Sequence, residues 1–573
     1  MTSTSFTRIT ASCSRRYLFQ TTARSYSTLP PALIRFGVSL DLFNYTSGRF
    51  LYNEKLRLRE RHVEFNIAAL KSAVEKHVRR GKVKDIVKIS EGGFNRILLA
   101  TMEDGFRSIV KIPYWISVPK VYATASEVAT LTFLRRKGIP VPEVYGWSST
   151  AENPVGVEYI IMEHAAGIGA DTQWFNTTKY QKHALVTGIV DIETKLFALP
   201  FKSIGSIYFK KDLPLRLQTE LYAQGSPDTD DDSKTFCIGP TTDYMFWYGK
   251  RSELELDRGP CKGEDPETYL TAIANKEIEW IKRFGRPLEC DFPHNTVFPG
   301  TNSPEDYLQL LDKYLALVPY LLPKNPLDPL NKLILRHPDL TPSNVFLCPD
   351  THQVKCLIDW QHTTIIPLLL TAGYPKLFEN PDSEPPEGLA PPKLPKGYDT
   401  MDPETKSHAN ELLRRQTLFY LYRVFNGGIN KPHLAALQDP LLLLRQILID
   451  AAGRQWSGNL MTMRAALMRT CQAWEYLPGN ASGSLPCPVQ FSDAEIQKQT
   501  EDDPMWCNLN ALVDYWRDQL GGLSEEGWIR SEAYDAAVRK NKALIAEFSV
   551  DGSEDELEKI KRGWPFQDRE EFF

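Results

Sequence analysis

Short runs of alternating hydrophobic and polar residues mark the region between residues 85 and 162, and such alternation is typical of β-strands. One helical pattern, over residues 124–138, interrupts these runs and ends at a glycine, a common helix stop. The pattern predicts a small lobe of five antiparallel strands and one helix. The expected strands are residues 85–89, 96–101, 106–112, 139–147 and 157–162.

Apolar residues recur at helical spacing on both sides of this region. The helices expected from this spacing cover residues 61–80, 177–199, 266–284 and 303–321, and residues 404–478 and 490–562 are mostly helical in pattern. The predicted fold class is therefore α+β, with a small β lobe and a large, mainly helical lobe. The expected parts are residues 1–30 as a leader, 31–84 as a helical extension, 85–165 as the N-lobe, 166–380 as a C-lobe with insertions, 381–403 as a proline-rich loop and 404–573 as the helical remainder of the C-lobe.

Polar residues stand at the ends of two apolar runs, 345–348 and 354–358, which flank a turn-forming cluster and predict a hairpin. With the turn centred between residues 351 and 352, Asn344 would lie opposite Asp359. An amide oxygen and a carboxylate at one place suit Mg²⁺. Asp339 lies five residues before Asn344 and could accept the proton of an attacking hydroxyl. For any one of these residues alone, an ordinary turn or strand end explains the position as well.

The spacing His337-x-Asp339-x4-Asn344, followed by Asp359 after a hairpin, resembles the catalytic loop of protein kinases and of aminoglycoside and choline phosphotransferases. The resemblance implies a bilobal, protein-kinase-like fold. It also implies that Asp339 is the catalytic base and that Asn344 and Asp359 bind Mg²⁺. Trp360 follows Asp359 where a protein kinase has Phe-Gly, which favours the small-molecule branch over a protein kinase.

The first strands carry the expected nucleotide site. Gly92 and Gly93 form a small-residue turn, and backbone N–H groups of such a turn can approach phosphate oxygens because no Cβ intervenes. Lys111 stands among apolar residues of the third strand, where a cation is costly to bury unless it is paired. In the kinase pattern such a lysine holds the ATP phosphates and a helix glutamate orients it, which assigns that part to Glu127. The alternative for Glu127 is a helix-dipole residue.

The same resemblance completes the set of nucleotide-binding candidates. It places the hinge that reads adenine directly after the last strand of the lobe. The candidates are Gly92, Gly93, Phe94, Asn95, Lys111, Glu127, Glu163 and His164.

Composition narrows the class of protein further. The net charge of −5 over 573 residues gives no indication of nucleic-acid binding. The nine cysteines are scattered without a Cys-x-x-Cys pair and are typical of reduced thiols. No segment is long and apolar enough to span a bilayer. The first acidic residue is Asp41, and the basic, hydroxyl-rich stretch before it predicts a mitochondrial transit peptide cleaved after Tyr26, with a disordered cytosolic tail as the alternative.

Several stretches resemble the fungal mitochondrial family named altered inheritance of mitochondria protein 9. They are residues 45–54, 91–96, 124–130, 153–163 and 336–339. This resemblance implies an aminoglycoside-phosphotransferase-like fold in mitochondria, and it implies no substrate. The expected cleavage of the transit peptide favours the matrix.

Two functions remain open from the sequence. The first is an ATP- and Mg²⁺-dependent phosphotransferase that moves the γ-phosphate of ATP to a hydroxyl of an unknown small-molecule acceptor. The second is a catalytically inactive nucleotide-binding or scaffold protein of the same fold. The sequence indicates neither the acceptor nor an oligomeric state.

Overall fold

The computed structural model describes residues 41–571 except 175–176, 229, 263–264, 383–387, 481–482, 484 and 550–553. The predicted transit peptide lies outside the described residues. Within the described part, no helix combines the length and the apolar character needed to cross a membrane.

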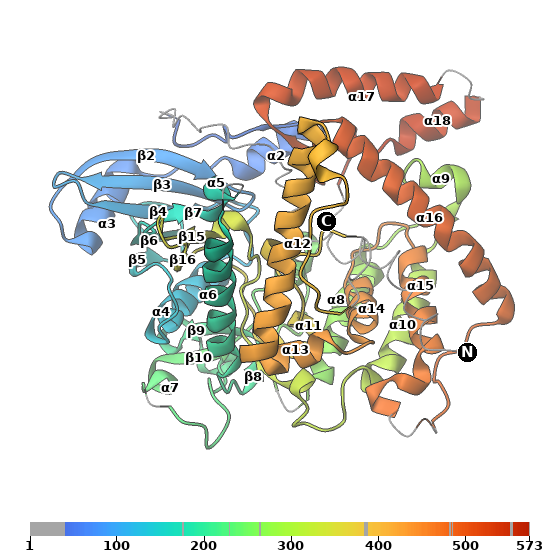
Figure 1. The fold of residues 1–573 in the computed structure, drawn as a ribbon, viewed down its shortest axis with the longest axis horizontal. Coiled ribbons are helices and arrows are strands. Elements are labelled where there is room, and N and C mark those ends of the chain that lie inside the picture. Colours follow the sequence, from blue (N-terminus) through green and yellow to red (C-terminus); the bar gives the residue numbers. More distant parts are fainter. Residues whose placement is uncertain are drawn as a thin grey trace.

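A five-stranded antiparallel sheet forms the small lobe, with strand order β2-β3-β4-β6-β5 (Figure 1). The strands are β2 Val83–Glu91, β3 Asn95–Met102, β4 Arg107–Pro113, β5 Val144–Ser148 and β6 Tyr159–Glu163. The five predicted strands are confirmed. The fourth begins later than expected because Pro140 and Pro142 lack the N–H group that a paired strand needs.

Two helices accompany this sheet. α3, Ile67–Val78, precedes it, and its buried residues Leu70 and Val74 share a core with the inner residues of the strands. α4, Tyr122–Arg136, is buried along nearly its whole length because it lies between the sheet and strand β9, Ser206–Phe209, of the large lobe. Helix α4 therefore packs against both lobes.

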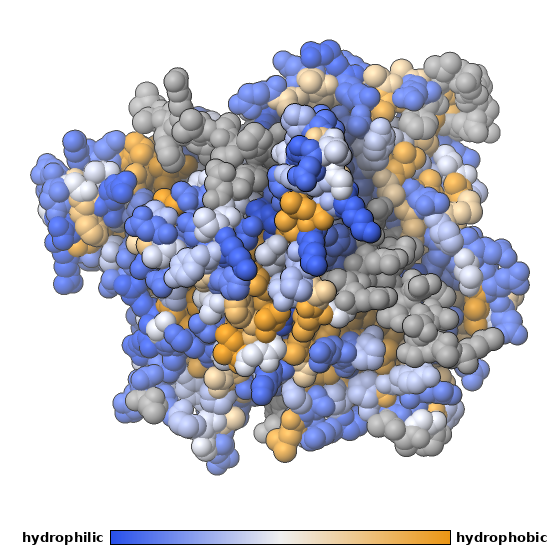
Figure 2. All heavy atoms as spheres, in the orientation of Figure 1, coloured by the Kyte–Doolittle hydropathy of each residue, from blue (hydrophilic) through white to orange (hydrophobic). Residues whose placement is uncertain are grey.

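The large lobe is mainly helical. Its long helices are α6 Lys179–Phe197, α8 Glu267–Phe284, α10 Pro304–Leu321, α12 Pro403–Ile429, α14 Leu442–Ala452 and α15 Met461–Gln472. Shorter helices are α5 Ala170–Gln173, α7 Asp232–Thr235, α9 His294–Val297, α11 Leu368–Thr371 and α13 Lys431–Leu437. Helices α6 and α12 lie side by side near the centre of the molecule (Figure 1). On the face drawn in Figure 2, hydrophilic residues dominate and hydrophobic residues gather in small groups between them.

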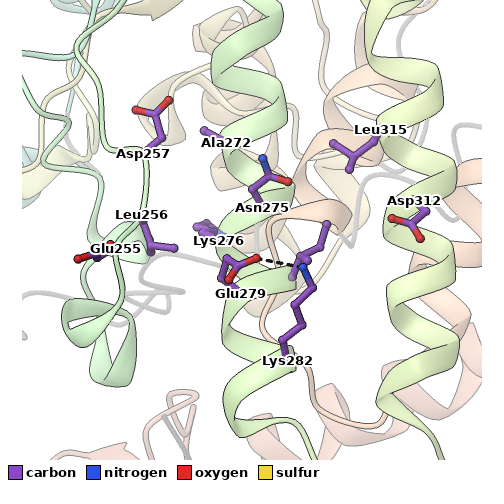
Figure 3. A pocket seen from close by; sticks show the side chains of 11 residues that line it. Glu255, Leu256, Asp257, Ala272, Asn275, Lys276, Glu279, Lys282, Asp312 and Leu315 are labelled. Carbon is purple, nitrogen blue, oxygen red and sulfur yellow. Dashed lines mark hydrogen bonds and ion pairs between the residues drawn. The ribbon is translucent and has the colours of Figure 1, made fainter.

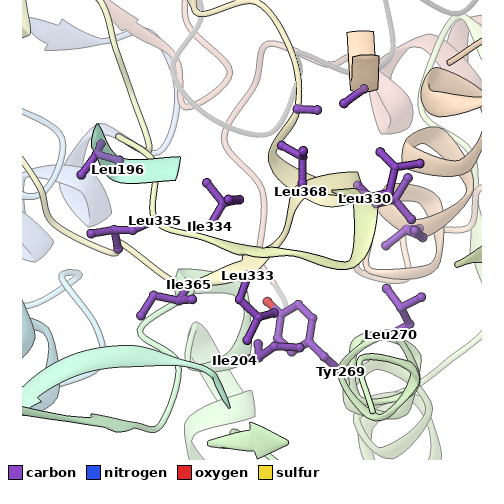
Figure 4. Close-up of a cluster of buried hydrophobic side chains, with 14 of the residues drawn as sticks. Leu196, Ile204, Tyr269, Leu270, Leu330, Leu333, Ile334, Leu335, Ile365 and Leu368 are labelled. Atoms are coloured by element: carbon purple, nitrogen blue, oxygen red, sulfur yellow. The ribbon is translucent and has the colours of Figure 1, made fainter. Parts of the chain in front are cut away.

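Short strand pairs hold the segments of the large lobe together. They are β14 Leu333–Ile334 with β17 Ile366–Pro367, β10 Phe236–Gly239 with β9, β11 Cys261–Lys262 with β8 Ser203–Ile204, and β12 Leu288–Glu289 with β13 Thr301–Asn302. Strand β14 runs through the core, where Leu333, Ile334 and Leu335 lie among Leu196, Ile365 and Leu368 (Figure 4). This burial fixes the position of the chain that follows, residues 336–339.

The predicted hairpin is present, with a register that differs by one residue from the expected one. Strand β15, Val345–Leu347, pairs with β16, Val354–Leu357, and with β7, Ile168–Gly169. Val345 lies opposite Leu357, so Asn344 faces Ile358 rather than Asp359. The cause is the turn, where His352 is buried and left-handed at φ 54° and the ladder shifts after Phe346.

The C-terminal part of the chain returns to the N-terminal extension. It contains α16 Asp493–Gln519, α17 Tyr534–Ser549 and α18 Glu554–Gly563, which lie along one side of the molecule (Figure 1). Strand β18, Trp528–Ile529, pairs with β1, Arg49–Phe50, and the buried Arg61 of α2, Glu54–Arg61, forms an ion pair with Glu526. Residues far apart in the sequence thus form one cluster around Trp516 and Trp564.

Candidate active site

The amine of Lys111 connects both lobes. Lys111 lies on β4, Glu127 on α4, and Asp359 follows β16. The Nζ atom of Lys111 is 2.7 Å from Glu127 Oε1 and 2.8 Å from Asp359 Oδ1. Lys111 and Glu127 are buried, whereas the side chain of Asp359 is 44% exposed. The structure therefore brings together the two residues expected to pair and adds Asp359 from the large lobe.

These three groups set one another's ionisation. Burial alone would lower the pKa of Lys111, but the carboxylates of Asp359 and Glu127 outweigh it and raise that pKa above its ordinary value. Burial raises the pKa of Glu127, and Lys111 only partly opposes this. At Asp359 the nearby Lys111 outweighs burial, so the pKa of this carboxyl is lowered. Asp359 is therefore ionised at neutral pH.

The backbone at Asp359 is strained. Its φ is 64°, and φ of His362 is 61°, both in the left-handed region that residues other than glycine rarely adopt. Such conformations persist only where the surroundings enforce them, and they cluster at functional sites. At Asp359 the left-handed turn ends the strand and redirects the carboxylate toward Lys111.

The loop from His337 to Asn344 is held by its own hydrogen bonds. His337 Nδ1 accepts the backbone N–H of Asp339 at 3.1 Å, and Nε2 lies 2.8 Å from the carbonyl oxygen of Ile358. A carbonyl can only accept, so the proton of this imidazole is on Nε2 and the ring is neutral; burial lowers its pKa accordingly. Asn344 Nδ2 donates to the carbonyl oxygen of Asp339 at 2.8 Å. His337 thus connects the Asp339 loop to the residue before Asp359.

The donor set fits Mg²⁺. Because the Asn344 amide nitrogen binds the Asp339 carbonyl, its oxygen is the atom turned toward other partners. Asp359 supplies an ionised, partly exposed carboxylate. One carboxylate and one amide oxygen are the protein contribution expected of a magnesium site that also uses phosphate oxygens. Within the described residues, no group of three or more His, Cys, Asp or Glu side chains could hold a metal ion.

The glycine turn lies over this region and is closed. The N–H of Gly92 donates to the carbonyl oxygen of Asn95 at 2.9 Å, and Asn95 Nδ2 donates to Gln361 Oε1 at 2.5 Å. The ring of Phe94 contacts Tyr244 and His362. A Cβ at Gly93 would meet no atom within 4 Å, so protein packing does not require glycine there.

The two hinge candidates differ in what they contact. The Glu163 carboxylate accepts from Arg135 at 2.9 Å and from the N–H of Glu143 at 3.0 Å, so this side chain fixes the end of β6. His164 follows the strand, and burial lowers its pKa. Any contact with adenine from this segment would come from the backbone, as the resemblance implies.

Three polar residues of this region escaped the sequence analysis. Lys376 Nζ lies 3.0 Å from Asp339 Oδ1, although the two residues are 37 positions apart. Arg336 binds Glu193 of α6 and two backbone carbonyls of the segment after β17. Gln361 bridges Asn95 and Ser117. An Arg directly before the His337 motif was a signal for a structural network, whereas Lys376 has no local signal.

A separate pocket of about 380 Å³ lies between α8, α10 and residues 255–257 (Figure 3). Glu279 and Lys282 form an ion pair at its wall (Figure 3). None of the predicted site residues lines it, so it is not part of the candidate active site.

A small lobe with a five-stranded antiparallel sheet and a large, mainly helical lobe define a bilobal α+β fold, in which the Lys111–Glu127 pair faces Asp359. No protein-family model matches the chain. A subtelomeric hrmA-associated cluster protein of Aspergillus fumigatus is 32% identical over 521 residues, which are 85% of this chain and 97% of the relative. The chain belongs to the same family as this Aspergillus protein. It is also similar to altered inheritance of mitochondria 9 proteins, of which that of Yarrowia lipolytica is 25% identical over 86% of this chain and 85% of its own.

Among solved structures, a thermostable mutant aminoglycoside phosphotransferase in ternary complex with ADP and hygromycin B matches 73% of this chain and 99% of its own. The TM-score is 0.33 and the identity 14%.

Proposed function

We propose that the protein is an ATP-dependent phosphotransferase that moves the γ-phosphate of ATP to a hydroxyl of a small-molecule acceptor. The observation that carries this proposal is the contact of Lys111 with both Glu127 and Asp359 across the two lobes. A buried lysine oriented by a helix glutamate and facing an ionised aspartate is the arrangement that kinases use for phosphoryl transfer.

Each predicted residue has a part in this reaction. Lys111, oriented by Glu127, binds the α- and β-phosphates, and the turn from Gly92 to Asn95 covers them with backbone N–H groups. Asn344 and Asp359 would hold Mg²⁺, which would neutralise charge on the phosphates. The backbone of Glu163 and His164 contacts adenine.

Asp339 is the catalytic base. Its carboxylate accepts the proton of the acceptor hydroxyl as that oxygen bonds to the γ-phosphorus. The bond from the γ-phosphorus to the bridging oxygen breaks, and ADP leaves with the electron pair. The hydrogen bonds of His337 and Asn344 position this loop for the attack.

Mitochondria are the proposed location, with the matrix favoured by a cleaved leader. The support is the composition of the first 40 residues together with relatives that are named mitochondrial.

One observation favours the second candidate function, an inactive nucleotide-binding or scaffold protein. The space lined by Asn95, Lys111, Glu127 and Gln361 measures only about 10 Å³, and the Asn95–Gln361 hydrogen bond closes it. That space holds about one water, so triphosphate binding requires this turn to open.

Thermal unfolding with nucleotide tests the nucleotide site. A ligand that binds only the folded protein raises its unfolding midpoint. We expect millimolar ATP with Mg²⁺ to raise the midpoint of the wild type and not of Asp359→Ala. Absence of a shift in the wild type would exclude both nucleotide-binding functions and leave only a scaffold that keeps the fold without its chemistry.

Turnover then separates the two candidates. ATP consumption is expected to fall about 100-fold or more in Asp339→Asn, while the nucleotide-induced shift persists. Asp350→Asn, the same change in the exposed hairpin turn, serves as the control. Equal rates for Asp339→Asn and the control would support the inactive protein.

A further inference from the structure

The ammonium group of Lys376 lies directly beside the proposed base. Its Nζ is 3.0 Å from Asp339 Oδ1, and the two side chains are 26% and 35% exposed. A surface ion pair of this kind is often incidental and contributes little to stability. The contacts around Lys376 therefore decide whether the fold holds this ion pair in place.

The backbone around Lys376 is fixed from two sides. The N–H of Leu377 donates to the carbonyl oxygen of Leu340, the residue after Asp339, at 3.2 Å. Leu377 and Phe378 are buried, and the ring of Phe378 packs on Tyr422 of α12. The backbone of Lys376 is therefore held in place by packing and by a hydrogen bond.

Arg336 joins this segment to the catalytic loop. Its Nη1 and Nη2 atoms donate to the carbonyl oxygens of Thr371 at 2.6 Å and Gly373 at 2.9 Å. Its Nε binds Glu193 at 2.8 Å, and Tyr422 binds both Arg336 and Glu193. The strand end that carries Asp339 thus also fixes the segment that carries Lys376, so the distance between the two is set by one buried network.

The two lysines of the candidate site belong to different lobes, Lys111 to strand β4 of the small lobe and Lys376 to the large lobe. Lys111 is held by Glu127 and Asp359 on the side of the small lobe. Asp339 lies on the acceptor side, where an incoming hydroxyl and the γ-phosphate would add negative charge during transfer. Lys376 places a positive charge at this second side.

We propose that Lys376 is a second cationic catalytic residue, which binds the γ-phosphate of ATP from the acceptor side while it holds Asp339. The inference rests on the proposed phosphotransferase function. An ammonium has three donors, so it can hold a carboxylate oxygen and a phosphate oxygen at once. A charge fixed where negative charge develops stabilises the transition state without reorganisation.

Nucleotide selectivity tests this assignment without knowledge of the acceptor. The dissociation constants of ATP and ADP, each with Mg²⁺, are measured by calorimetry for the wild type, Lys376→Met and Lys376→Arg. Loss of one charge-assisted hydrogen bond to phosphate is expected to weaken ATP binding about tenfold or more in Lys376→Met. ADP lacks the γ-phosphate, so its affinity stays unchanged. Lys376→Arg keeps the charge and retains most of the preference for ATP.

The control is Lys396→Met, the same change at an exposed lysine nearby, and Lys376→Gln repeats the test with a polar side chain. A merely structural lysine would affect ATP and ADP equally. An unchanged ratio of the two affinities in both Lys376→Met and Lys376→Gln overturns this inference alone. A wild type that binds neither nucleotide overturns the proposed function and this inference with it.

Discussion

Removal of the Lys111 amine is the most informative single perturbation of this fold. Lys111→Met leaves the carboxylates of Glu127 and Asp359 facing a thioether in place of the cation that lies 2.7 and 2.8 Å from them. Glu127 is 4% exposed, whereas Asp359 can turn partly to water. Most of the expected loss of folding stability therefore comes from the unpaired carboxylate of Glu127.

The magnitude follows from this burial. Breaking a buried ion pair on one side destabilises a protein by about 3–5 kcal/mol, because the remaining charge has no partner. Asp359 is half exposed, which places the expected loss at the lower end of this range. For a lobe of this size the unfolding midpoint falls by several degrees.

The loss depends on pH in a defined direction. Burial already raises the pKa of Glu127, and removal of Lys111 removes the main opposing effect. A carboxyl whose folded pKa exceeds its unfolded value binds more protons in the folded state, so the stability of the variant falls as pH rises above the unfolded value near 4.5. The difference between Lys111→Met and the wild type is therefore smaller at pH 5 than at pH 8.

Thermal unfolding of both proteins at pH 5 and pH 8 measures this difference. Glu127→Leu in the Lys111→Met background provides the matched control, because an apolar pair removes the stranded charge and should recover part of the midpoint at pH 8. Equal midpoints of Lys111→Met and the wild type at both pH values would refute the reasoning.

Two further predictions concern contacts between segments that are far apart in the sequence. Asn95→Ala removes the hydrogen bond to Gln361 at 2.5 Å and should speed the association of ATP with Mg²⁺ in stopped-flow fluorescence, and an unchanged rate would show that the glycine turn is not a barrier. Glu526→Gln weakens the ion pair with the buried Arg61, which keeps its longer contact with Glu60 at 3.4 Å. The free energy of unfolding should therefore fall by only about 1 kcal/mol, seen as a lower unfolding midpoint. Glu532→Gln, an exposed glutamate six residues away, is the control, and an equal midpoint for the two would contradict a tethering role of Arg61.

Sequence patterns predicted the small lobe because most of its paired strands are neighbours along the chain. Alternation along each strand and short turns between strands define the sheet, whereas the pairing of Lys111 with Glu127 was expected from the resemblance to kinases. The hairpin after Asn344 was predicted, but its register was wrong by one residue. The conformation of His352, left-handed and buried against α5, depends on the fold and has no counterpart in the residue pattern.

Lys376 shows the other kind of failure. Its contact with Asp339 depends on the path of the chain through β17 and on the Arg336 network, which only the folded large lobe creates. The return of the C-terminal residues to β1 has the same origin, because a two-residue strand pair carries almost no sequence signal. Local patterns identify the strands and loops of this site, whereas the contact of Lys376 with Asp339 arises only when the large lobe packs.

The closed glycine turn and the Lys376–Asp339 pair share one physical consequence. In the proposed reaction, ATP phosphates would enter the space that the Asn95–Gln361 hydrogen bond closes. The acceptor hydroxyl and the γ-phosphate would likewise approach the Lys376–Asp339 pair. If the open turn is populated only in part, the apparent affinity for ATP is reduced by that fraction. Asn95→Ala should then tighten ATP binding as well as speed it, whereas Lys376→Met weakens it. Opposite signs for these two variants, measured in one calorimetric series, would separate a conformational barrier from a direct contact with phosphate.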